Sequence, residues 1–209
     1  MAHLTAGPTP LTSNQVRGFW AAWGGWALDG MDSFIYALVL TPAITELLPR
    51  SGIEATPGNI GYYGSLLFAL FLFGWGCSMV WGPLADRFGR VKTLMLMQCL
   101  MGLSYLMWAI AHDRMAFAIF ALWFGLSYGS IVSLLPAICM DLFGGKAVSA
   151  IIGTLYTGAA FGNLLGPVLA GQVFDLTGQY NWVIWITLCI AAVATFSCWR
   201  ILKYPQQPH

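Results

Sequence analysis

Two aspartates, Asp29 and Asp32, are the residues of this sequence whose type and spacing could do chemistry. They lie in a run that carries no other charged residue between Arg17 and Glu46. On a helix, residues three apart lie on the same face, so the two carboxyl groups would be neighbours. Neighbouring carboxylates resist being ionised together, and one of them then holds a proton, as a proton carrier must.

The apolar run around these acids begins near Gly18. At a rise of 1.5 Å per residue, Asp29 and Asp32 would lie about 16 and 21 Å along a helix that starts there, near the middle of a membrane. A charge at that depth is costly unless it meets water, a partner or a proton. We therefore expect Asp29 and Asp32 to act in proton coupling and substrate binding. Two alternatives stay open: the helix begins later, or the acids only tie helices together through hydrogen bonds.

The composition places the whole chain in a lipid bilayer. Of 209 residues, 58% are hydrophobic and 8% are charged, whereas a soluble domain carries about 25% charged residues. The formal net charge of +1 provides no basic face for a nucleic acid. No signature of a metal or cofactor site occurs, and HExxH is not present. We expect neither an enzyme nor a cofactor.

Six stretches are apolar enough to cross a bilayer, which takes about 20 residues per helix. They are residues 18–40, 60–83, 93–111, 115–140, 147–174 and 180–199. Inside lipid the backbone must bond within its own segment, so these stretches are expected to be helices. The expected fold is an all-α membrane domain over residues 18–203, with tails at 1–17 and 204–209 and a longer connection at 41–59.

Basic residues in the short connections predict the orientation. One side collects Arg17, Arg87, Arg90, Lys92, Lys146, Arg200 and Lys203. The other side carries only Arg50 and Arg114. Because basic loops stay inside the cell, both termini are expected in the cytoplasm, with the protein in the plasma membrane.

The connection after the second stretch resembles the signature loop of the major facilitator superfamily, G-x-L-a-D-r-x-G-r. Residues 82–90 read GPLADRFGR, and the matching positions are Gly82, Leu84, Asp86, Arg87, Gly89 and Arg90. Glycine permits tight turns and close helix approach, and a carboxylate favours a helix N-terminus. The resemblance implies a secondary transporter in which the Asp and Arg form a latch between two halves. It also implies that this chain is one half, built from two three-helix units in inverted repeat.

Residues 25–36 (GWALDGMDSFIY) and 68–76 (FALFLFGWG) are similar to the first two helices of proton-coupled metabolite symporters of the sialic acid and aromatic acid type. This resemblance implies proton-coupled transport of a small organic anion, a carboxylate or an acidic sugar.

The second half departs from that group. Residues 120–129 read FALWFGLSYG, with Ala121 where those symporters have an arginine. Residues 135–144 and 153–171 resemble helices 10 to 12 of monocarboxylate and oxalate–formate carriers, although Gly-x3-Gly-Pro also occurs in helix 5 of drug–proton antiporters. Two interpretations stay open: a natural six-helix half, or helices 1–3 joined to helices 10–12 after loss of the middle.

Glycines four residues apart in the fifth stretch predict close helix packing in lipid. Gly158, Gly162 and Gly166 lie on one face, and Pro167 is expected to bend the helix just beyond them. A six-helix half would work by pairing with a second copy of itself or with a missing second half. The alternative is a transporter remnant without activity.

Overall fold

A computed structural model describes residues 12–144, 148–179 and 181–202, without the side chains of 14, 32, 33 and 200–202. Its elements are α1 (Ser13–Arg50), α2 (Pro57–Cys77), a 3₁₀ turn η1 (Ser78–Val80), α3 (Trp81–Phe88), α4 (Arg90–Ala109), α5 (Arg114–Phe143), α6 (Val148–Thr177) and α7 (Asn181–Leu202). Because α2, η1 and α3 follow one another as a single rod, the described chain has six helices able to cross a membrane. The expected all-α, six-helix fold is confirmed.

The first helix is longer than the sequence predicted. A connection was expected over 41–59, but α1 continues through Pro42 and Pro49 to Arg50. The reason is packing: Ile44, Leu47 and Leu48 are buried in the core, and their spacing forms a helical stripe whose burial outweighs the breaks in hydrogen bonding at the prolines. At the other end, α1 begins within the predicted tail 1–17.

The N-terminus of α1 is capped by side chains of its own first turn. The Thr12 side chain accepts a hydrogen bond from the Gln15 backbone, and the Gln15 side chain accepts one from the Thr12 backbone. This reciprocal capping satisfies donors that a helix start leaves free. Residues 1–11 and the predicted tail 204–209 lie outside the described residues.

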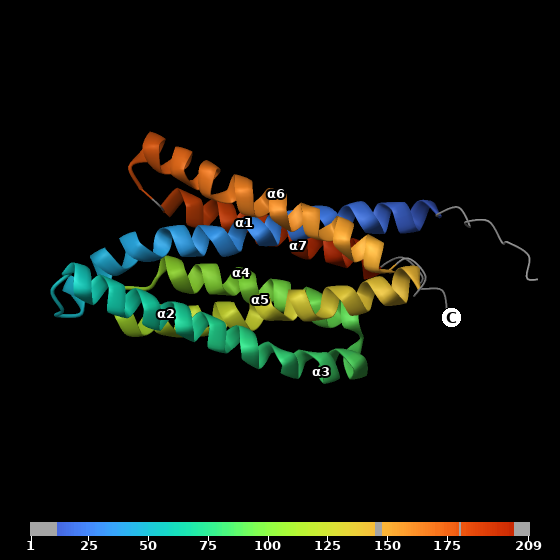
Figure 1. The fold of residues 1–209 in the computed structure, drawn as a ribbon, viewed down its shortest axis with the longest axis horizontal. Helices are drawn as coiled ribbons and strands as arrows, with labels where there is room; N and C mark the ends of the chain where they lie inside the picture. The colour runs from blue at the N-terminus through green and yellow to red at the C-terminus, as the bar shows by residue number, and fades with distance from the viewer. Residues whose placement is uncertain (1–11, 145–147, 180, 203–209) are drawn as a thin grey trace, which may run out of the picture.

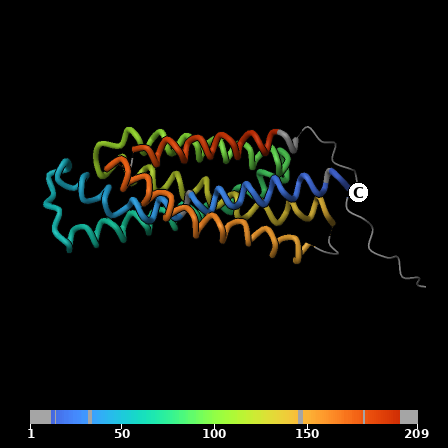
Figure 2. The backbone as a smooth tube through the Cα atoms, turned by 90° about the horizontal axis from the view of Figure 1, so that it is seen from above, coloured from blue at the N-terminus to red at the C-terminus, as the bar shows by residue number. Residues whose placement is uncertain are grey.

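The helices pack in an arrangement that repeats within the chain (Figures 1 and 2). The most extensive packing joins α1 to α6, α2 to α5, and α4 to α7. Exchanging α1 with α5, α2 with α6, and α4 with α7 turns the first two pairs into each other and leaves the third unchanged. The bundle therefore consists of two three-helix units in inverted repeat.

Both tightest crossings depend on glycine. A methyl group on Gly162 of α6 would collide with the backbone carbonyl of Ala27 on α1, and one on Gly158 would lie 2.5 Å from the carbonyl oxygen of Trp23. In the equivalent crossing, methyl groups on Gly74 of α2 and Gly125 of α5 would strike the backbone of the other helix. The crossing of α2 and α5 at these two glycines was not predicted from the sequence.

The two ends of the bundle are filled differently. One end, which we call the basic end, holds the start of α1, the α3–α4 turn, and the ends of α5 and α7 (right in Figure 1). Toward the opposite end, closely packed aromatic rings of α1, α2, α4 and α5 fill the centre, with centroids 5.2–5.7 Å apart. We call these rings the aromatic cluster: Tyr36, Phe71, Tyr105, Trp108, Phe117, Phe120 and Phe124.

Candidate functional site

Asp29 is buried in the middle of the bundle and bonded to an amide on another helix. Its side chain is 3% exposed. Gln98 of α4, also 3% exposed, donates from Nε2 to both carboxyl oxygens, at 3.1 and 3.3 Å. The α1 helix supplies the acid and α4 supplies the amide, so the contact joins two elements of the same three-helix unit.

The surroundings of this pair hold no compensating charge. The cavity beside Asp29 is lined by apolar side chains, Ser197, and the thiols of Cys139 and Cys198, with no Lys, Arg or His among the described lining residues. A buried charge without a partner is strongly disfavoured, which makes Asp29 a candidate to hold a proton. Protonation would make Asp29 both a donor and an acceptor.

Gln98 is suited to both forms of the acid. Its Oε1 is buried and has no hydrogen-bond partner in the described part of the chain. An amide presents either an N–H or a carbonyl oxygen after a half turn. Its N–H groups serve the ionised carboxylate, and its oxygen can accept from the protonated acid. The pair could therefore bind and release a proton without leaving a buried donor unpaired.

Asp32 belongs to α1, as predicted, but its side chain lies outside the described part of the chain. Asn163 of α6 packs against α1 at Gly30, where a methyl group would lie 2.8 Å from the Asn163 Oδ1. That oxygen is buried and unpaired among the described residues.

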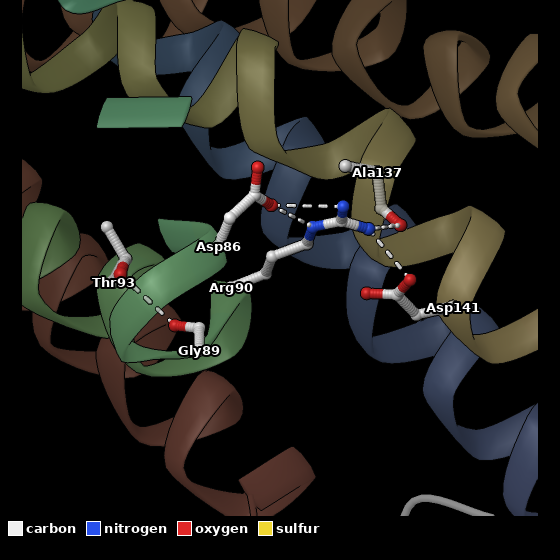
Figure 3. A network of polar contacts seen from close by, with 6 residues as sticks. All are labelled: Asp86, Gly89, Arg90, Thr93, Ala137 and Asp141. Carbon is white, nitrogen blue, oxygen red and sulfur yellow. Dashed lines mark hydrogen bonds and ion pairs between the residues drawn. The ribbon is translucent and has the colours of Figure 1, made fainter. Parts of the chain in front are cut away.

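The signature loop forms a second polar cluster at the basic end (Figure 3). Arg90 at the start of α4 donates to Asp86 of α3 at 3.1 Å and to Asp141 of α5 at 2.7 Å. It also donates to the carbonyl oxygen of Ala137 at 3.2 Å. One guanidinium therefore ties the α3–α4 turn to the end of α5. These contacts lie within this chain, so the predicted latch between two halves stays a prediction.

The other residues of the loop divide by role. Gly89 has φ +97°, a conformation that side chains rarely adopt, and this lets α3 turn directly into α4. Gly82 makes no close approach here, since a methyl group on it would meet no atom within 4 Å. Leu84 and Arg87 are exposed on the outside of α3.

The glycines of α6 that were predicted to pack against another helix do so, and that helix is α1. Gly158, Gly162 and Gly166 are buried against α1. The helix continues past Pro167 to Thr177. Ala121, which replaces an arginine of the symporter group, is fully buried among the residues that carry the aromatic cluster.

Sequence reasoning missed Gln98 and Asp141. Gln98 could have been noticed as an amide in the apolar stretch 94–103, at the depth where a polar group needs a partner. Asp141 offered a weaker signal because it directly follows the predicted span 115–140, where a charged residue can reach water without a partner. Neither contact follows from spacing, since the partners are 69 and 51 residues apart.

Comparison with known proteins now identifies the group. The Major Facilitator Superfamily profile matches residues 22–209. The chain belongs to this superfamily. Among its relatives, human monocarboxylate transporter 2 is 35% identical over 101 residues, 48% of this chain and 21% of the relative. The multidrug resistance protein MdtG of Serratia proteamaculans is 32% identical over 174 residues, 82% of this chain and 40% of the relative.

Solved structures share the fold. The POT family transporter PepTSo superimposes with a TM-score of 0.78 at 20% identity, covering 96% of this chain and 40% of that one. The proton:xylose symporter XylE gives 0.73 at 16% identity, covering 93% and 45%. This major-facilitator chain thus spans less than half the length of these relatives. It is a multi-pass membrane protein, and the relatives are transporters rather than enzymes.

Proposed function

We propose that this chain is one half of a proton-coupled carrier of small organic anions, with Asp29 as the proton-binding residue. The observation that carries the proposal is the Asp29–Gln98 pair, a fully buried acid held by a neutral amide. The similarity to a monocarboxylate transporter supports an organic anion as the substrate. Asp32, three residues further along the same helix, is the second proposed coupling or substrate residue.

The carrier requires a second bundle. Alternating access moves two six-helix bundles about a site between them, and this chain supplies one. A second copy of this chain or a second half would supply the other bundle. The Asp86 and Arg90 cluster would then face that partner's loop at the basic end.

We also propose that the basic end faces the cytoplasm of a cell bounded by its plasma membrane. The support is the charge bias of the loops. A single cysteine in place of exposed Arg87, in a variant without native cysteines, should react with an impermeant maleimide only after the cells are opened. Reaction in intact cells would reverse the orientation.

The test of function is uptake into proteoliposomes of purified protein. A panel of small carboxylates is offered with an inward proton gradient and again after a protonophore. Uptake should depend on the gradient and should be lost in Asp29→Asn, whereas Asp113→Asn, which alters an exposed helix cap, should keep it. Gradient-driven uptake that persists in Asp29→Asn would refute the role of Asp29.

Drug transport is a second candidate, favoured by the match to MdtG over 82% of the chain. It differs from the first in substrate charge and in direction. Cationic or neutral drugs should then leave vesicles as protons enter, and carboxylates should not move. If neither class moves and native mass spectrometry finds only monomers, the inactive remnant is the correct interpretation. The close helix crossings and the paired acid argue against that outcome.

A further inference from the structure

A narrow cavity inside the bundle joins the basic end to Asp29. It is enclosed by α1, α4, α5 and α7 and extends along α1 from Gly18 to Asp29, which is about 16 Å of helix. Its lining is half-exposed at Gly18 and Phe143 and becomes buried at Gln98 and Asp29. The opening therefore lies at the basic end, and the acid lies at the closed end.

Small residues of α1 create this space. Gly18, Ala22, Gly25 and Asp29 follow one another at spacings of three or four residues and all line the cavity. Methyl groups on Gly18 or Gly25 would meet no atom within 4 Å. Unlike Gly158, Gly162 and Gly166 of α6, these glycines are not needed for helix contact, and their effect is to leave a gap.

The gap has the size and chemistry for water. Its volume is about 50 Å³, enough for roughly four molecules at about 10–15 Å³ each. Four waters at a spacing of about 2.8 Å would form a file roughly 11 Å long, which reaches from Asp29 about as far as the partly exposed Ala22. Asp29 and the unpaired Oε1 of Gln98 provide polar partners of the kind that buried water requires, and Ser197 of α7 also lines the cavity.

Asp29 is the one acid among the described residues that line the cavity. From α4 the facing group is Gln98, from α5 the Cys139 thiol, and from α7 Ser197 and the Cys198 thiol. On α6, Tyr156 packs on the neighbouring Trp26 with ring centroids 4.2 Å apart. None of these carries a charge at neutral pH.

We propose that Asp29 exchanges its proton with the basic end through this file of water, inside one half of the carrier. The proton then does not have to pass through the space between the two halves, where the substrate binds. The inference rests on the proposed role of Asp29 as the proton-binding residue. It adds a separate route for the proton, and Gly25 is a position in its lining where a larger side chain would obstruct it.

Gly25→Leu tests the route, and Gly24→Leu is its matched control. Both glycines lie in α1 with no atom within 4 Å of an added methyl, but only Gly25 lines the cavity. A leucine in a helix leans toward the N-terminus, so at Gly25 it would lie along the path to the basic end. The substitutions are made in the full chain, reconstituted in lipid.

The measurement is infrared detection of the Asp29 carboxylic acid band, identified by its loss in Asp29→Asn. On transfer to heavy water the band shifts as deuterium replaces the proton. Exchange should be about tenfold slower in Gly25→Leu, an added barrier of about 1.4 kcal/mol, and unchanged in Gly24→Leu. If Gly25→Leu does not fold, Ala22→Leu, also in the lining, serves in its place.

Equal exchange in the two leucine variants, or the absence of an Asp29 acid band, would overturn the route. These readings require no substrate, so they separate from the uptake test. Normal uptake dependence on Asp29 with unaltered exchange in Gly25→Leu would reject the route alone. Slowed exchange in Gly25→Leu together with uptake that is unchanged in Asp29→Asn would reject the proposed function alone.

Discussion

Replacing Gly162 by alanine should weaken the crossing of α6 over α1. A methyl group there would collide with the Ala27 carbonyl oxygen and lie 2.7 Å from its carbon and 2.9 Å from the Met31 nitrogen. Ordinary contacts of this kind are about 3.5–4.0 Å. The helices must separate by roughly 1 Å, which loses a quarter to a half of the attraction of each contact in the crossing.

The size of the effect follows from a comparison with Gly153→Ala. Gly153 lies in the same helix, and a methyl group on it would meet nothing within 4 Å. Alanine in place of glycine favours a helix by about 0.5–1 kcal/mol at either position, so this gain cancels between the two variants. What remains is the overpacking at Gly162, about 1–3 kcal/mol.

The assay is unfolding by SDS titration from a mild detergent, followed by tryptophan fluorescence. Gly162→Ala should unfold at a lower SDS fraction than the parent, and Gly153→Ala at an equal or higher one. If the two variants unfold together, α1 and α6 are not in the close contact described here. The inverted-repeat packing would then lose its best support.

Three further outcomes follow. Gln98→Leu should reduce proton-driven uptake, and adding it to Asp29→Asn should cause no further loss, because the two residues act as one unit; additive losses would contradict the pairing. Gly89→Ala should lower the free energy of unfolding in SDS by about 1–2 kcal/mol, since φ +97° strains any side chain there; an unchanged free energy of unfolding would argue against that turn. Asp141→Asn should cost only about 0.2–1 kcal/mol, because its pair with Arg90 is half-exposed; a loss above 3 kcal/mol would show a buried role.

The elements of this protein were largely predictable because each has a local cause. Long apolar runs predict spans, and the structure has six of them. The end of α1 was mispredicted because Pro42 and Pro49 are local signals. Burial of Ile44 and Leu48 against other helices decides the outcome, and a single sequence does not display it.

The candidate site was half predictable for the same reason. Asp29 is conspicuous because an acid in an apolar stretch is costly wherever the helix packs. Its partner depends on how α4 lies beside α1, which no spacing encodes. Likewise Arg90 was identified from the loop motif, whereas its bond to Asp141 depends on where α5 ends.

The inverted repeat makes the difference between the two ends of the bundle informative. The exchange that relates α1 to α5 should give both units equivalent interiors, and the glycine crossings are indeed equivalent. The cavities are not equivalent: the one toward the basic end is lined by small α1 residues and Asp29, whereas the one of about 300 Å³ toward the other end is lined by Phe117 of the aromatic cluster and does not include Asp29. In the proposed route the proton therefore reaches Asp29 from the basic end, where the cavity that includes this acid opens. The same helices can thus form a symmetric frame and still give their buried acid contact with one side of the membrane.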